Sequence, residues 1–343
     1  MRKVTLKDVA SAAGVSPSVV SAALNNRSYT RISIQRRERI QAVASRLGYR
    51  PNFEASCLSL GRSASIGIFL PGWLDVLLQE LVQGLSAAAF TYSLPLSFSF
   101  GLKPSSYSFF VKSMHSYRHS GIISYVPNLT KTSAEISDSL NEYMRDGGKV
   151  ISLNPANEPL KGSSVFRIDE SYGGKLAAEY LLQKKEIESF AALCVAGDRF
   201  AARLDSFCSI IGGENKKVEV YNLSGGKAIN AESIRKAFDD LFERLPKPIA
   251  FFLTCTGFSN WLFNLATEKG LKYEKDYFVV AYDRQDFFGD LHPIPRIIQP
   301  FYQMGYAAIE KLNTLLLNKE GLDELLKPKL VVGGSLSEWK NSQ

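Results

Sequence analysis

From about residue 64 onwards, short apolar runs alternate with longer amphipathic stretches. The runs have the length of buried strands, and the stretches between them repeat apolar residues at helical spacing. Strand and helix in alternation predict parallel sheets that are covered by helices on both faces. The expected strands are 66–70, 122–125, 150–153, 166–169, 191–195, 249–253, 278–281, 296–298 and 330–332, and the expected helices include 76–90, 134–145, 174–182, 234–245 and 304–317. This number of strands fits two stacked α/β subdomains, in which ligands bind beyond the carboxyl ends of the strands.

The charge of the chain is concentrated in its first segment. The whole chain of 343 residues carries a net charge of +7, and residues 1–62 hold eleven Lys or Arg against three acids, a net +8. The remainder is therefore close to neutral, at −1. A basic N-terminal segment on a near-neutral body indicates an anionic partner, and nucleic acid is the first candidate.

The first fifty residues contain three short helical patterns, each with its own end signals. The first begins with Thr5 as N-cap and has an acid, Asp8, three residues later, which is the spacing of a capping box. It ends at Gly14, where a tight turn costs little. The second begins at a Ser-Pro pair, 16–17, and the third covers 33–47.

Two helices joined by a glycine turn form the helix-turn-helix arrangement, whose second helix enters the major groove of DNA. A helical hairpin of this size could also be ordinary core packing, but the surrounding positive charge favours DNA binding. The side chains expected to face outward on the second helix are small and mostly polar. They are Pro17, Ser18, Ser21, Ala22 and Asn25.

The same region resembles a known family. Segments 4–10 (VTLKDVA), 13–16 (AGVS), 20–21, 24–25 and 47–52 (LGYRPN) closely resemble the LacI/GalR (lac-repressor-type) family of bacterial transcription regulators. The resemblance implies a helix-turn-helix DNA-binding headpiece over 1–50 and a hinge helix with linker over 51–63. In the family, the hinge helix folds on operator DNA and a leucine wedges into the minor groove. Leu58 stands at that position, and such a wedge kinks the duplex.

The helix pattern and the resemblance together imply a set of DNA-contacting positions. These are Thr5, Ser16, Pro17, Ser18, Ser21, Ala22, Asn25, Ser33, Arg36, Tyr49, Asn52, Ala55 and Leu58. Two departures from the family bear on this set. Ala22 replaces a common arginine that could read a guanine, so we expect a different operator base pair there. Glu54 and Ser56 replace apolar or basic hinge residues, which weakens the expected hinge–phosphate attraction.

The resemblance continues more thinly through the rest of the chain. Segments 66–71, 121–123 and 281–283, the Asp169 turn with its Gly-Gly pair, the segment around Arg203 and the stretch 298–305 follow the family's order. They imply an α/β core of two parallel-sheet subdomains over 64–343, like that of periplasmic sugar-binding proteins. Crossovers between the subdomains are expected near residues 160, 290 and 325, with a small effector in the cleft.

The resemblance also implies an effector site. Its expected residues are Trp73, Asp75, Tyr125, Arg203, Asp283 and Gln299. Asp283 can accept hydrogen bonds from vicinal hydroxyls, Arg203 offers a fork of N–H donors, and Trp73 offers an aromatic face. Each has an alternative: Asp283 could cap the next segment, Arg203 could pair with a surface acid, and Trp73 could be core.

Several family motifs of the cleft are absent. Residues 254–256 (TCT) replace an Asn-Asp pair, residues 333–335 (GGS) replace Arg-Glu-Ser, and no Asn-Pro-Phe-Phe segment follows the first strand. The identity of the effector therefore cannot be inferred from the family. We expect the cleft to hold either an unusual ligand or none.

The sequence gives little support to other classes of protein, such as enzymes. His115 and His119 are four residues apart but lack the glutamate of an HExxH motif, so we expect no metal site. The four cysteines form no CxxC, and no GxSxG elbow, Walker loop or GxGxxG occurs. The Gly-Gly pairs at 212–213 and 225–226 indicate loops. No apolar run has membrane-span length and the start has no secretory pattern, so we expect a cytoplasmic protein without cofactor or enzyme activity.

The sequence therefore predicts a homodimeric transcription regulator, most simply a repressor, on a pseudo-palindromic operator. A sugar or related metabolite would control it, and the protein would be nucleoid-associated when bound. Two alternatives remain open: a regulator that has lost effector sensing, and a cytoplasmic solute-binding module. Residues 335–343 show no leucine heptads, so we expect no C-terminal tetramer bundle.

Overall fold

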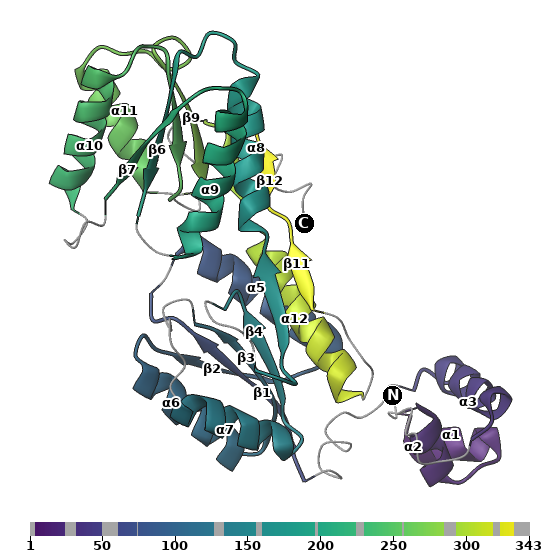
Figure 1. Ribbon diagram of the computed structural model, residues 1–343. Helices are drawn as coiled ribbons and strands as arrows, with labels where there is room; N and C mark the ends of the chain where they lie inside the picture. The colour runs from purple at the N-terminus through teal and green to yellow at the C-terminus, as the bar shows by residue number, and fades with distance from the viewer. Residues whose placement is uncertain are drawn as a thin grey trace. The chain divides into compact units, whose positions relative to one another are not determined.

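The computed structural model contains three N-terminal helices and two six-stranded sheets with helices on their faces (Figure 1). It describes residues 4–24, 32–49, 61–73, 75–126, 134–155, 160–195, 198–223, 230–255, 257–284, 293–317 and 323–332. Within these residues, no helix combines the length and apolar character needed to cross a membrane.

The N-terminal helices are α1 (Leu6–Ala13), α2 (Pro17–Leu24) and α3 (Ile34–Arg46). The capping box predicted for α1 is present, because the Thr5 hydroxyl accepts from the backbone N–H of Asp8 and the Asp8 carboxylate accepts from that of Thr5. Gly14 ends α1 in the left-handed conformation, with φ of 66°. The three helices share one small apolar core, whose buried members are Val9, Ala10, Ala13, Val20, Ala23, Ile40 and Ala44.

The first sheet has the order β11-β5-β4-β3-β1-β2. Its strands are β1 (Ser63–Leu70), β2 (Leu96–Phe100), β3 (His119–Tyr125), β4 (Lys149–Leu153), β5 (Ser164–Ile168) and β11 (Glu324–Leu326). β1 pairs in parallel with β2 and β3, β3 with β4, and β5 with β11. The helices of this part are α5 (Val76–Tyr92), α6 (Pro104–Ser116), α7 (Ala134–Arg145) and α12 (Phe301–Leu316). Apolar side chains of α6 and α7 form one core with those of β1, β3 and β4.

The second sheet has the order β12-β10-β9-β8-β6-β7. Its strands are β6 (Ser189–Cys194), β7 (Val218–Asn222), β8 (Ile249–Leu253), β9 (Tyr277–Tyr282), β10 (Arg296–Ile298) and β12 (Lys329–Val331), and β10–β12 is the antiparallel pair. Its helices are α8 (Glu170–Leu182), α9 (Asp198–Gly213), α10 (Ala231–Arg244) and α11 (Phe258–Glu268). Alternate residues of β8 serve the two faces: Phe251 packs with α10 and α11, and Phe252 with α8 and α9.

The chain divides into two compact units. Unit 1 comprises residues 1–72, 85–165 and 306–323, and unit 2 comprises 73–84, 166–305 and 324–343. The chain thus changes unit after residues 72, 84, 165, 305 and 323. The helix-turn-helix headpiece and the two parallel-sheet subdomains predicted as the fold class are confirmed.

One local expectation was wrong. Gly212 and Gly213 do not form a loop but belong to the end of α9, since they lack the positive φ of a turn.

Helices α8 and α9 approach each other at a glycine. A Cβ atom placed on Gly174 of α8 would lie 2.1 Å from the carbonyl oxygen of Arg203 on α9. This is far inside van der Waals contact with backbone, which cannot move aside as a flexible side chain could. The helix pair therefore requires glycine at this position for steric reasons.

We expect Gly174→Ala to lower the free energy of unfolding of unit 2 by about 1–3 kcal/mol, because the added methyl overpacks the helix contact. Urea unfolding followed by tryptophan fluorescence would measure the change. The matched control is Gly212→Ala in α9, where a Cβ meets nothing within 4 Å. That variant should gain roughly 0.5–1 kcal/mol, and an equal loss in both variants would contradict the steric explanation.

Candidate functional site

The N-terminal end of α2 presents small polar side chains to solvent. Ser16, Pro17 and Ser18 are all exposed, and the Ser16 and Ser18 hydroxyl oxygens lie 2.9 Å apart. The Ser16 hydroxyl also accepts from the backbone N–H of Val19 at 3.4 Å. Ser21, one turn further along, is half-buried. An exposed helix start with short side chains can approach a base edge or a phosphate closely.

Four other predicted DNA contacts serve as helix ends or lie near them. Thr5 and Ser33 are exposed N-caps of α1 and α3. Arg36 is exposed in the first turn of α3, and Tyr49 packs partly buried against the three-helix core. Asn25, Asn52, Ala55 and Leu58 lie outside the described residues.

Ala22 does not face outward as the helix pattern suggested. Its side chain is only 4% exposed, so it is not available to a base edge in this conformation. A single methyl is easily covered by neighbouring residues, and its small size explains why helical spacing alone misplaced it. The outward-facing prediction for Ala22 was therefore wrong.

Polar side chains gather where strands of the second sheet end. Asp283 directly follows β9, Gln299 follows β10 and Thr254 follows β8. Because these strands are parallel neighbours, their carboxyl ends meet at one edge of the sheet. All three residues are buried. This edge is where ligands bind in open α/β sheets.

Asp283 and Gln299 are joined directly. One carboxylate oxygen of Asp283 accepts from the backbone N–H of Gln299 at 3.0 Å, and the other accepts from its side-chain amide at 2.6 Å. Asp283 also has a positive φ of 52°, a conformation that non-glycine residues rarely adopt. Burial raises the pKa of its carboxyl to about 6, although the Arg203 charge and the Gln299 hydrogen bonds oppose the shift.

Arg203 is fixed by an ion pair inside unit 2. Its Nε and one terminal nitrogen donate to the Glu170 carboxylate at 2.6 and 2.9 Å, and the other terminal nitrogen donates to the Thr254 carbonyl at 2.8 Å. The guanidinium carbon lies 3.7 Å from the ring centroid of Tyr282. Arg203 therefore pairs with an acid, as its alternative reading proposed, but that acid is buried rather than on the surface.

Glu80 on α5 is a site residue that the sequence did not single out. Burial raises the pKa of its carboxyl to about 7, while the nearby Arg284 charge lowers it and the Asp283 charge raises it. Glu80, Asp283 and Arg284 all belong to unit 2. Glutamate is ordinarily solvent-exposed, so nothing in the sequence indicated that Glu80 would be partly buried.

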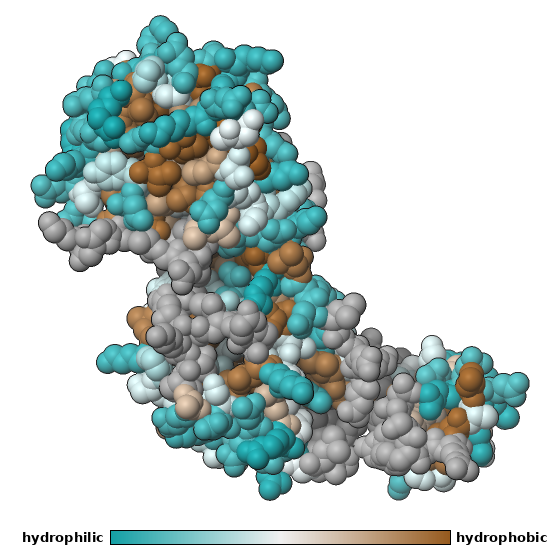
Figure 2. Space-filling view, in the orientation of Figure 1, coloured by the Kyte–Doolittle hydropathy of each residue, from teal (hydrophilic) through white to brown (hydrophobic). Residues whose placement is uncertain are grey.

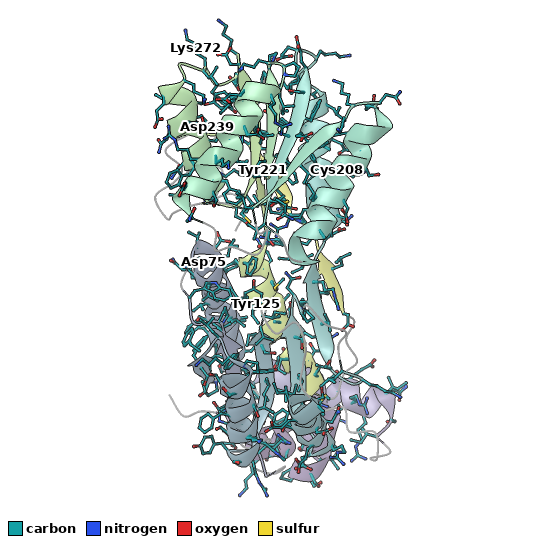
Figure 3. The ribbon with its side chains drawn as sticks, turned by 60° about the vertical axis from the view of Figure 1, so that its left-hand side comes forward. Asp75, Tyr125, Cys208, Tyr221, Asp239 and Lys272 are labelled. Carbon is teal, nitrogen blue, oxygen red and sulfur yellow. The ribbon has the colours of Figure 1, made fainter. Side chains whose placement is uncertain are left out.

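The other three predicted effector residues lie on or beside α5 and β3. Asp75 is exposed at the start of α5, where its carboxylate accepts from the backbone N–H of Leu78 at 2.7 Å (Figure 3). Tyr125 is buried at the end of β3 in unit 1, and Trp73 is half-buried in unit 2. Across the described ranges, no three His, Cys, Asp or Glu residues are placed to hold a metal ion.

Comparisons with known proteins address the headpiece first. Residues 5–52 match the family model of bacterial regulatory proteins, lacI family. These residues contain α1, α2 and α3 with their caps.

The N-terminal segment is therefore similar to the lacI family.

Two curated relatives match over nearly the whole length of the chain. It is 24% identical to catabolite control protein A of Staphylococcus xylosus, covering 94% of both chains. It is also 24% identical to the HTH-type transcriptional repressor PurR of Vibrio atlanticus, covering 92% of this chain and 93% of that one. These relatives are regulators rather than enzymes.

Solved structures share the fold. A complex of the transcriptional regulator CelR with cellobiose matches with a TM-score of 0.64 and 19% identity, over 97% of this chain and 100% of that one. The lac repressor dimer bound to operator and the anti-inducer ONPF matches with a TM-score of 0.62 and 20% identity, over 97% and 98%. At these identities the likeness establishes the fold of the chain and nothing beyond it.

The buried carboxyls predict a pH dependence of stability. The pKa values of Glu80 and Asp283, about 7 and about 6, lie above those of the unfolded chain, so the folded state binds more protons between about pH 4 and pH 7. Stability of unit 2 therefore falls as pH rises through this range. Glu80→Gln should therefore lose less free energy of unfolding between pH 5 and pH 8 than the parent chain.

Urea unfolding followed by tryptophan fluorescence at both pH values would test this prediction. The control is Glu179→Gln, which removes an exposed carboxylate of α8. If the Glu80 variant loses as much stability between pH 5 and pH 8 as the parent chain, Glu80 does not contribute to the pH dependence.

Proposed function

We propose that this chain is a sequence-specific DNA-binding transcription regulator, most simply a repressor, controlled by a small effector. The observation that carries the proposal is the match of residues 5–52 to the lacI family model, over three capped helices. The exposed start of α2 and the net charge of +8 on residues 1–62 support it independently.

In this proposal, the start of α2 enters the major groove. Ser16 and Ser18 carry hydroxyls that can donate to or accept from bases and phosphates, while Arg36 offers a charge to the backbone. None of the exposed α2 residues carries a charge, so the basic residues contribute affinity and salt dependence rather than base reading. Specificity then depends on close approach and on bending, for which Leu58 is the proposed minor-groove wedge.

We propose the polar edge of unit 2 as the effector site. The structures that match include a complex with cellobiose and a regulator of Enterococcus faecium with bound ribose, both polyhydroxyl ligands. Asp283 and Gln299 supply buried acceptors and an amide for hydroxyl groups, and Arg203 holds the strand ends in place. An effector would act by binding one conformation better than another and so shifting their populations.

A second copy of the chain is the proposed partner. The edge strand β2 exposes the stacked pair Phe98 and Phe100, and the edge strand β7 exposes Val220. Trp261 of α11 is also partly exposed, and hydrophobic atoms gather over the face of unit 2 where β7 lies (Figure 2). The lac repressor was solved as a dimer on its operator. We further propose a bacterial cytoplasmic protein without catalytic activity.

One observation favours the alternative of a regulator that has lost effector sensing. Arg203 already donates to Glu170 and Thr254, and Asp283 already accepts from Gln299. The polar groups of this edge are thus satisfied within the protein, and residues 254–256 lack the family's Asn-Asp pair. A ligand must therefore replace some internal hydrogen bonds rather than fill vacant ones.

Leu58→Ala tests the DNA half of the proposal. The parent chain should select a pseudo-palindromic sequence from random DNA, and the variant should bind that sequence at least 10-fold more weakly because the kinked complex loses its wedge. Binding to unrelated DNA, measured in the same titration, should change little because it rests on phosphate contacts. Equal losses on both DNAs would contradict the wedge.

Asp283→Asn tests the effector half. Thermal-shift screening of sugars and nucleosides should identify a compound that raises the Tm of the parent chain, and the variant should lose most of that shift because a charged acceptor becomes an amide. Asp239→Asn, at an exposed carboxylate of α10, is the control. If no compound raises the Tm of the parent chain, the alternative without effector sensing is the better reading.

A further inference from the structure

A second polar pocket lies in unit 1, away from every residue assigned above. It has a volume of about 530 Å³ and is lined by Gly61, Arg62, His115, Ser116, Arg118 and Asp146. These residues come from the chain that enters β1, the end of α6 with the turn after it, and the end of α7. Gly61 is the first described residue after the segment that joins the headpiece to unit 1.

Hydrogen bonds fix the walls of this pocket. Arg62 donates from two nitrogens to the carbonyl of Asp146, at 3.2 and 2.5 Å, and from the third to the carbonyl of His119 at 2.6 Å. Its guanidinium carbon also lies 5.3 Å from the ring centroid of Tyr143. His115 Nε2 lies 2.7 Å from the Asp146 carboxylate. The pocket is therefore built before any ligand binds.

Two groups of the pocket remain largely available. Arg118 is exposed and makes one long hydrogen bond, from a terminal nitrogen to the Gly61 carbonyl at 3.3 Å. The Ser116 hydroxyl is exposed and has no hydrogen-bond partner among the residues that the structure describes. Arg118 has a positive φ of 53°, which keeps its side chain at the turn between α6 and β3.

The charges around the pocket favour an anion. Arg62 and Arg118 line it, and Arg145 acts on Asp146 from the neighbouring position. Asp146 is the acid of the lining, and its carboxylate is hydrogen-bonded to His115. That hydrogen bond, with smaller contributions from Arg62 and Arg145, holds the pKa of Asp146 below its ordinary value. Two arginines, Arg62 and Arg118, therefore line the pocket with one carboxylate.

We propose that this pocket binds a phosphate group, with Arg118 and Ser116 as its principal donors. A guanidinium fork and a hydroxyl match the geometry of phosphate oxygens, and the volume exceeds what one phosphate needs. The phosphate has two chemically equivalent sources: the backbone of DNA held by the headpiece, or a small phosphorylated metabolite. The DNA source rests on the proposed function, whereas the metabolite source does not.

The connecting chain permits the DNA source. Tyr49 and Gly61 are the described residues on either side of the joining segment, and twelve residues of extended chain span at most about 40 Å. DNA bound by the headpiece is therefore held near unit 1 at a high effective concentration. A weak phosphate contact would then add to operator affinity without needing to bind DNA alone.

The first experiment uses inorganic phosphate on the full chain. At constant ionic strength, replacing chloride by phosphate should raise the Tm of the parent chain, and isothermal titration should detect binding in the millimolar range. Arg118→Gln should abolish both signals, whereas Lys175→Gln, which removes an exposed cation of α8, should retain them. Arg118→Lys should keep part of the binding, because the charge remains but the fork is lost.

The second experiment measures operator affinity of the same variants at several salt concentrations. If the phosphate belongs to DNA, Arg118→Gln binds several-fold more weakly and the slope of log K against log salt falls by about one per subunit. Lys175→Gln should keep the parent slope. If the parent chain binds no DNA, the proposed function is wrong. The phosphate titration still tests whether the pocket binds phosphate.

A signal in the phosphate titration alone assigns the pocket to a small phosphorylated ligand, and a changed salt slope alone assigns it to the DNA backbone. Arg118→Gln that folds, by circular dichroism, and matches Lys175→Gln in both experiments would overturn the proposal.

Discussion

The buried ion pair between Arg203 and Glu170 joins the elements on which the rest of unit 2 depends. It links α9 to α8, reaches the end of β8 through the Thr254 carbonyl, and stacks on Tyr282 at the end of β9. Both charged side chains are largely shielded from water. Removing either one would therefore strongly destabilise the fold, because the other charge would be left unpaired. The same contact explains why Gly174 must lack a side chain, since α8 lies against the backbone of Arg203.

The polar side chains of this edge form two groups. Arg203, Glu170 and Tyr282 contact the strand ends, while Asp283 and Gln299 form a second, smaller pair beside them. Burial raises the pKa of the Glu80 carboxyl to about 7. The effector proposed for this edge would have to replace internal hydrogen bonds, which would couple its binding to the geometry of the sheet edge.

The sequence predicted the buried strands and one edge strand, β12, but not the other three edge strands. All nine expected strands are present, because central parallel strands such as β8 and β9 are continuous apolar runs. β2, β7 and β11 were missed, since edge strands alternate or carry polar residues and have no such run. The capped helix starts at Thr5 and Ser33 were predicted because capping is a local property.

The site residues also differ in whether neighbouring residues in the sequence or distant segments determine them. The resemblance brought Arg203, Asp283 and Gln299 to one unit of the protein, but only the structure shows that Arg203 is already paired. Glu80 and Arg118 could not be found in advance, because burial and pocket formation arise from segments far apart in the chain. Ala22 was misplaced for a different reason: helical spacing says which way a residue points but not what covers it.

The aromatic edge strand β2 has a consequence for the life of the chain before assembly. A sheet edge that exposes phenylalanines is a template for pairing with other extended chains, and β2 carries neither proline nor charge to prevent this. In the proposed dimer, a second copy that covered this edge would protect each subunit from aggregation. The cellular concentration of the chain would then set how much of it stays folded.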